Sequence, residues 1–160
     1  MNYSKERVSK VLFDTQVYIS YGPIIQSRKI EPGWYSVVVL QERMAGVSGG
    51  KELRKLEDLS RQLEKEGRLL VPNREAWITA GRILNNYLSD LSRAHPTRSR
   101  LARSRPALSH AEKQNLIRDV LIAVSAKQAG VIVVSDNKDF PTIQRYYDFK
   151  WSSGKDWFTA

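Results

Sequence analysis

The chain has 160 residues, 41% of them hydrophobic and 27% charged, which is typical of a single globular domain (1–160) rather than of a disordered segment. It has no cysteine and two histidines, which excludes disulfide scaffolds, thiol catalysis and zinc sites built on cysteine or on several histidines. Any metal would therefore be held by oxygen ligands, as Mg²⁺ or Mn²⁺ is. The formal charge of +9 favours a polyanionic partner such as nucleic acid. The charged start without an apolar leader and the lack of an apolar run of about 18 residues predict a cytoplasmic protein with no membrane span.

In the first half of the chain, short apolar runs alternate with helical patterns. Residues 11–13 predict a buried strand that ends at Asp14, and Gly22 and Pro23 predict a turn. Residues 37–40 are valines and leucine, and their propensity alone favours a strand. Residues 51–66 predict a helix because leucines recur at helical spacing, with Gly67 at the C-cap position, and residues 68–71 predict a short strand.

The second half continues the alternation of helix and strand. Asn73 is expected to cap a helix whose apolar face includes Trp77, and Ser109 and Glu112 form the capping-box pattern of another helix that ends near Gly130. Residues 131–134 predict a fully buried strand, and an aromatic tail follows. The order of strands and helices predicts an α/β fold with a mainly parallel sheet.

Acidic residues fall where the predicted strands end. Asp14 follows the first strand and Asp136 and Asp139 follow the last, and ligand sites in open α/β sheets form at the carboxyl ends of strands. Asp119 lies inside an otherwise apolar helix, where a carboxylate is costly unless it has a partner or an ion. The alternative is that these acids are helix caps, turn residues or members of ion pairs, and that Glu42 is simply solvated.

Four blocks of sequence together resemble the PIN domains, a family of small nucleases. They are VLFDT (11–15), SVVVLQE (36–42), DVLIAVSA (119–126) and VVSDNKDF (133–140). Their size and layout are most similar to the VapC-type toxins of toxin–antitoxin pairs. The resemblance implies a PIN-like three-layer α/β/α sandwich, and it implies that residues 37–40 are helical, against their strand propensity.

The resemblance also implies a site and an activity. It implies that Asp14, Glu42, Asp119 and Asp139 cut an RNA phosphodiester with the help of one or two Mg²⁺ or Mn²⁺ ions. The ions would be held by Asp14, Asp119 and Asp139, with Asp136 as the alternate to Asp139, because the register of the SDNKDF turn is ambiguous. Thr15, Ser135 and Asn137 would support the acids by hydrogen bonds. The partners that it implies are an RNA such as transfer RNA, an antitoxin protein and a second copy of the chain.

A basic segment precedes the helix of Asp119. Residues 92–109 hold five arginines and no acid, and prolines and serines predict a loop there. The arginines are candidates for contacts with RNA phosphates, or else belong to a solvated loop. They are Arg93, Arg98, Arg100, Arg103 and Arg105. The rival interpretations of the whole chain are a PIN-fold binding module without activity, a nuclease of RNA maturation or of DNA, and an α/β regulatory or structural protein.

Overall fold

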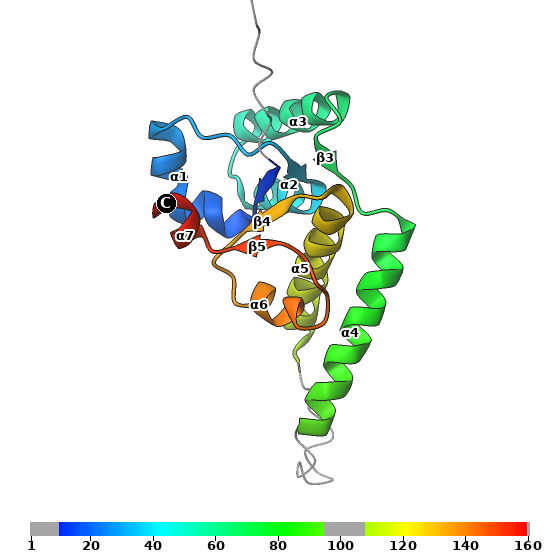
Figure 1. The fold of residues 1–160 in the computed structure, drawn as a ribbon. Helices are drawn as coiled ribbons and strands as arrows, with labels where there is room; N and C mark the ends of the chain where they lie inside the picture. The colour runs from blue at the N-terminus through cyan, green and yellow to red at the C-terminus, as the bar shows by residue number, and fades with distance from the viewer. Residues whose placement is uncertain (1–9, 95–107, 160) are drawn as a thin grey trace, which may run out of the picture.

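The sheet is parallel throughout and runs through the centre of the molecule (Figure 1). The computed structural model describes residues 10–94 and 108–159. In this part of the chain β1 pairs with β4, and β4 with β5, while β2 pairs separately with β3. A parallel bridge between Leu12 and Trp34 joins the two groups, with the Trp34 N–H donating to the Val11 carbonyl at 3.0 Å. The strands are β1 (Val11–Phe13), β2 (Tyr35–Ser36), β3 (Leu69–Leu70), β4 (Ile132–Val134) and β5 (Trp151–Ser152).

Helices cover both faces of the sheet, which confirms the three-layer α/β/α sandwich. Alternate side chains of β1 show the layering: Val11 and Phe13 pack with α1 and α7, whereas Leu12 packs with α5 on the other face. On that second face α4 lies along α5 (Figure 1). The helices are α1 (Thr15–Ser27), α2 (Val37–Gly46), α3 (Gly50–Lys65), α4 (Arg74–Ala94), α5 (His110–Ala129), α6 (Asp139–Gln144) and α7 (Gly154–Thr159). Within the described ranges no helix has both the length and the apolar character needed to cross a membrane.

Local signals determine where the main helices begin and end. The Ser109 hydroxyl accepts from the Glu112 N–H and the Glu112 carboxylate accepts from the Ser109 N–H, so the capping box of α5 is confirmed. Gly130 ends the same helix with a φ of 67°, a left-handed conformation that glycine adopts without strain. Asn73 accepts from the Ala76 N–H at 2.8 Å, which confirms it as the capping residue of α4.

Three predictions of local structure are wrong. Gly22 and Pro23 lie within α1, because the apolar residues on both sides of them pack into one cluster with β1 and α7. Residues 37–40 are helical, as the family resemblance implied, because the Ser36 hydroxyl accepts from the Val38 N–H and caps α2. Trp77 is 55% exposed and belongs to the outer face of α4.

Packing at the start of α7 leaves no room for a side chain at position 154. A Cβ on Gly154 would lie 2.6 Å from Tyr21 Cε2 and 2.9 Å from Asp136 Oδ2. We expect Gly154→Ala to lower the free energy of unfolding by about 1–3 kcal/mol, because Tyr21 must give up its stacking on Phe158 or its hydrogen bond to Asp136. Urea unfolding measures the difference.

Gly81→Ala is the matched control for that substitution. Gly81 lies inside α4 and a Cβ there would meet no atom within 4 Å. Because alanine is the better helix former, this variant should gain about 0.5–1 kcal/mol. A Gly154→Ala protein as stable as the wild type would contradict the packing of α7 against the turn after β4.

Candidate active site

Asp14 lies at the carboxyl end of β1 and is held from two sides. Its Oδ1 accepts from the Thr15 N–H at 2.7 Å, which makes Asp14 the N-cap of α1. Its Oδ2 accepts from the Ser135 hydroxyl at 2.8 Å, across the gap to the end of β4. The side chain is only 4% exposed, so both of its oxygens are oriented by these bonds.

The turn after β4 connects Asp14 to Asp119. The Asn137 N–H donates to the Ser135 hydroxyl at 3.0 Å, and the Asn137 side-chain amide donates to Asp119 Oδ2 at 2.8 Å. The carbonyl oxygen of the same amide accepts from the Asp139 N–H at 3.0 Å. One chain of hydrogen bonds therefore runs from Asp14 through Ser135 and Asn137 to Asp119, and the same asparagine positions Asp139.

Glu42 lies on α2 and is connected to Asp14 through Thr15. Its Oε2 accepts from the Thr15 hydroxyl at 2.6 Å, and its Oε1 lies 3.5 Å from Nη1 of Arg118 on α5. Thr15 thus contacts two of the acids, through its backbone N–H to Asp14 and through its hydroxyl to Glu42. The supporting contacts expected of Thr15, Ser135 and Asn137 are all present in this geometry.

These side chains line a cleft of about 330 Å³ at the carboxyl ends of β1 and β4. Sequence reasoning missed two members, Gln16 and Asn115. Asn115 lies one helical turn before Asp119 on the same face of α5, and this spacing was the available signal for it. The lining residues are Asp14, Thr15, Gln16, Glu42, Asn115, Asp119, Asn137 and Asp139.

Comparison with solved structures places this arrangement in a known architecture. A chain of the 2.2 Å structure of VapBC-1 from nontypeable Haemophilus influenzae is similar with a TM-score of 0.52 and 19% identity, over 91% of this chain and 98% of that one. A chain of the structure of FitAB bound to an IR36 DNA fragment is similar with a TM-score of 0.51 and 17% identity, over 90% of this chain and 94% of that one. The chain has the PIN-like fold. No family model and no curated protein matches the sequence.

Asp136 does not belong to the cleft of this PIN-like domain. Its Oδ2 accepts from the Tyr21 hydroxyl at 2.6 Å, and its Oδ1 accepts from the backbone N–H of Gly154 at 2.8 Å. It therefore ties α7 and α1 to the turn after β4, whereas Asp139 lines the cleft. The geometry favours Asp139 over Asp136 as the fourth acid of the cleft, and the choice of metal ligand stays a prediction.

The basic segment is placed only in part. Arg93 lies in the last turn of α4, where it pairs with Asp90 at 3.5 Å, so the predicted loop does not begin at residue 92. Arg98, Arg100, Arg103 and Arg105 lie outside the described residues, and their contacts with RNA stay a prediction.

The cleft is unfavourable for the charged form of Asp119. Burial, followed by the negative charges of Asp14, Asp139 and Glu42, raises the pKa of Asp119 from 3.8 to about 8. Burial also raises the pKa of Asp14, although the hydrogen bond from Ser135 opposes the shift. Both shifts favour the neutral, protonated form of these buried acids.

The donor set fits a divalent cation of the Mg²⁺ or Mn²⁺ type. Carboxylate oxygens are the ligands that these ions prefer, and a cation would offset the repulsion around Asp119. As the side chains stand, no three His, Cys, Asp or Glu residues among the described ones form a group that could hold an ion.

The raised pKa of Asp119 predicts a pH-dependent stability in the metal-free protein. Between the unfolded value of 3.8 and the folded value of about 8, the unfolded chain has lost a proton that the folded chain keeps. The free energy of unfolding should therefore fall as the pH rises through this window and level off above it.

Urea unfolding in EDTA between about pH 5 and 8 measures this slope, which Asp119→Asn should flatten because an amide does not ionise. Asp58→Asn on the exposed side of α3 is the control and should keep the wild-type slope. Equal slopes in the wild type and in Asp119→Asn would contradict the electrostatic description of the cleft.

Proposed function

We propose that this protein is a metal-dependent endoribonuclease that hydrolyses RNA phosphodiesters. The observation that carries the proposal is the convergence of Asp14, Glu42, Asp119 and Asp139 in one cleft, with Asp119 only 6% exposed. Four carboxylates so close together destabilise the fold, and a bound divalent cation is the partner that would offset their repulsion.

In this proposal the carboxylates of Asp14, Asp119 and Asp139 hold the ion, and Glu42 completes the cluster. A bound Mg²⁺ or Mn²⁺ ion lowers the pKa of a water molecule and offsets the charge that develops on the attacked phosphate. The chain's own task is to orient the acids. Thr15 fixes Asp14 and Glu42, and the Ser135–Asn137 chain fixes Asp14 and Asp119.

RNA as the substrate and a toxin role are part of the proposal. The net charge of +9 supports a polyanionic substrate. The toxin role is supported by the sequence resemblance to VapC-type toxins and by the fold shared with chains of the VapBC-1 and FitAB structures. The same support extends to an antitoxin protein as partner. Transfer RNA as a target, a homodimer and a cytoplasmic location stay predictions of the sequence.

Two alternatives differ from this proposal in measurable ways. An RNA-maturation nuclease would have the same chemistry but would not arrest growth when it is expressed without a partner. A PIN-fold binding module is favoured by the absence, in the described residues, of an ion site that is already assembled. The module would bind nucleic acid without metal-dependent cleavage.

Substitution of the buried acids should separate cleavage from binding. We expect Asp14→Asn and Asp119→Asn to lose at least about a hundredfold in the rate of RNA cleavage with Mn²⁺, because each removes a charge that holds the ion. Gel analysis of a labelled structured RNA measures cleavage, and anisotropy of the same RNA measures binding, which both variants should retain. Asp58→Asn should cleave like the wild type, and EDTA should stop cleavage in every case. An active Asp119→Asn protein would overturn the assignment.

A further inference from the structure

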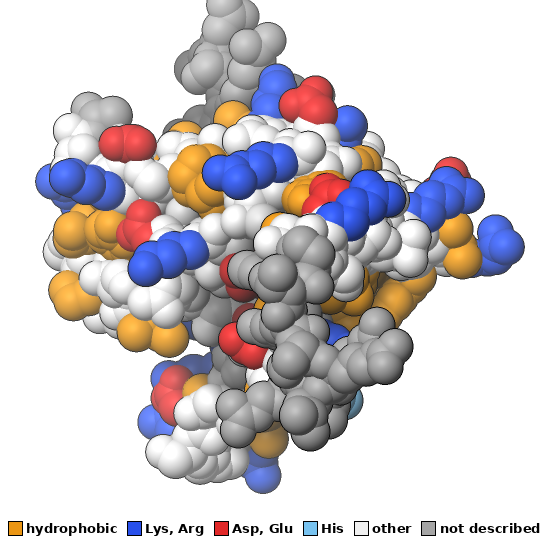
Figure 2. Space-filling view, turned by 90° about the horizontal axis from the view of Figure 1, so that it is seen from below, with side chains coloured by type: hydrophobic (Ala, Val, Ile, Leu, Met, Phe, Trp, Pro, Cys, Tyr) orange, Lys and Arg blue, Asp and Glu red, His pale blue; other side chains and the backbone are white. Residues whose placement is uncertain are grey.

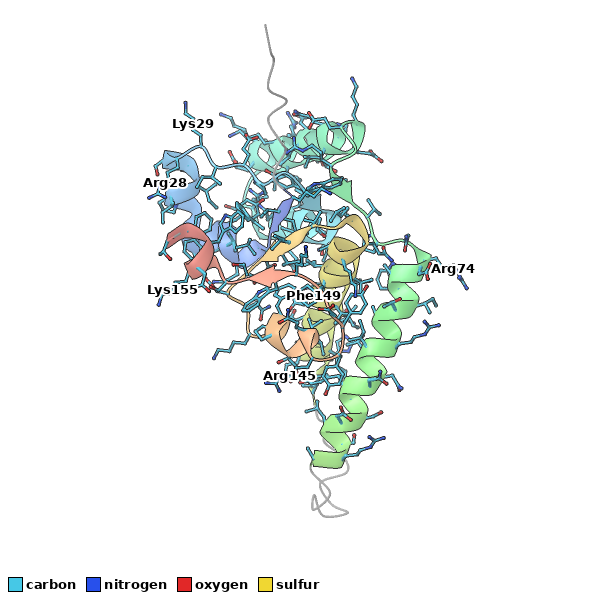
Figure 3. All side chains as sticks on the ribbon, viewed as in Figure 1. Arg28, Lys29, Arg74, Arg145, Phe149 and Lys155 are labelled. Atoms are coloured by element: carbon cyan, nitrogen blue, oxygen red, sulfur yellow. The ribbon has the colours of Figure 1, made fainter. Side chains whose placement is uncertain are left out.

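Among the residues that the structure describes, few positively charged side chains lie at the acidic cleft, although the chain is strongly basic. The ion pairs among the described residues join Lys55 to Glu52, Arg61 to Asp58, Arg68 to Glu66, Arg93 to Asp90 and Arg118 to Glu42. In this set, Arg118 is the one cation that pairs with an acid of the cleft. Other cations project from the outside of the molecule: Figure 3 shows Arg28 and Lys29 at the end of α1, Arg74 at the start of α4 and Arg145 beside α6.

Figure 2 shows the face of the molecule seen from below, where acidic side chains lie near the middle and lysine and arginine side chains are spread over the rest of the visible face. A phosphate group that approached the cleft would be repelled by its ionised acids, and Arg118 is the cation within the described residues that pairs with one of the four acids, Glu42. Arg118 therefore occupies a position, within the described part of the chain, from which it can attract a phosphate.

The contacts of Arg118 with Glu42 and Asn115 are long and involve one nitrogen of its guanidinium group. A single nitrogen, Nη1, lies 3.5 Å from Glu42 Oε1 and 3.4 Å from Asn115 Oδ1, and both distances are at the limit for a hydrogen bond. The side chain is 39% exposed, and solvent weakens such a pair further. A guanidinium group has five N–H donors in a planar fork that matches two oxygens of a phosphate. A phosphate would thus be a better partner for Arg118 than Glu42 is.

We propose that Arg118 binds an RNA phosphate at the cleft. In the absence of RNA it pairs with Glu42, and it leaves Glu42 for the phosphate once another partner neutralises the negative charge of Glu42. This inference rests on the proposed nuclease function. Glu42 keeps its short bond from Thr15 through Oε2, so the exchange breaks only the long contact through Oε1. The Arg118 guanidinium contacts Glu42 and Asn115, which both line the cleft, so a phosphate held by this group would lie at the rim of the cleft.

The test measures RNA binding in EDTA, where the proposed activity is absent. Anisotropy of a labelled single-stranded RNA, titrated at several salt concentrations, compares the wild type with Arg118→Gln, Arg118→Lys, Glu42→Gln and the Glu42→Gln/Arg118→Gln double variant. Arg61→Gln is the matched control because Arg61 also pairs with one carboxylate, on α3. Thermal melting of each variant checks that it is folded.

We expect Glu42→Gln to release Arg118 and bind RNA more tightly than the wild type. Arg118→Gln should then cost at least about fivefold in affinity in the Glu42→Gln background and clearly less in the wild-type background. The slope of log affinity against log salt should fall by about 0.7 when Arg118 is lost from that background, which corresponds to one phosphate contact on a single strand. Arg118→Lys should recover only part of the affinity because it keeps the charge but not the fork, and Arg61→Gln should change neither quantity.

Two results would overturn the inference. An equal loss from Arg118→Gln in both backgrounds would contradict the exchange with Glu42, and no loss in either background, or no RNA binding at all, would contradict the phosphate contact. The proposed function is tested separately, because cleavage by the wild type with Mn²⁺ that persists alongside either result leaves the nuclease assignment in place.

Discussion

The repulsion among carboxylates that surround a buried aspartate is the constraint on which the rest of this site depends. Asp119 lies in the middle of α5, where neighbouring positions form the core, and its pKa is raised to about 8 by burial and by three other acids. A helix with a neutral residue at this position would be easier to fold. The surrounding structure keeps the acids together because the carboxylates of Asp14, Glu42 and Asp119 accept hydrogen bonds, and the Asp139 backbone N–H donates to Asn137.

The parallel sheet is what brings these donors together. β1 and β4 are neighbours in parallel register, so Asp14 and Ser135 leave the sheet at the same edge. The turn after β4 then reaches α5 through Asn137, and α1 begins at Asp14 and reaches α2 through Thr15. Strand ends, a helix cap and one asparagine thus place four acids from four parts of the chain around one cleft. Asp136 lies outside the cleft and supports the same arrangement of acids, because its hydrogen bonds fix the turn after β4 to α1 and α7.

Much of this architecture could be predicted from the sequence because it depends on local patterns. The apolar strands, the capping box at Ser109 and the glycine that ends α5 are short-range signals, and all are confirmed. Strand propensity failed at residues 37–40, where Ser36 caps a helix, and only the resemblance to PIN domains indicated the helix.

The choice between Asp136 and Asp139 could not be made from sequence. Both follow β4 in the same turn, and the deciding contact joins Asp136 to Tyr21, which is 115 positions away. Gln16 was missed for a similar reason, since an exposed polar residue has no sequence signal until the fold shows what lies beside it. The turn predicted at Gly22 and Pro23 failed because packing of the apolar residues around them outweighed the local preference.

Thermal melting with and without a divalent ion tests the central claim most directly, that the clustered acids form a cation site. If Mn²⁺ binds the folded protein, a concentration about a hundredfold above its dissociation constant should stabilise it by about 2.7 kcal/mol. For a chain of 160 residues this corresponds to a rise of about 5–10 °C in Tm over the value in EDTA. The rise should vanish in Asp119→Asn, which also relieves the repulsion and should melt above the wild type in EDTA. An equal rise in both proteins, or no rise in the wild type at millimolar Mn²⁺, would contradict the claim.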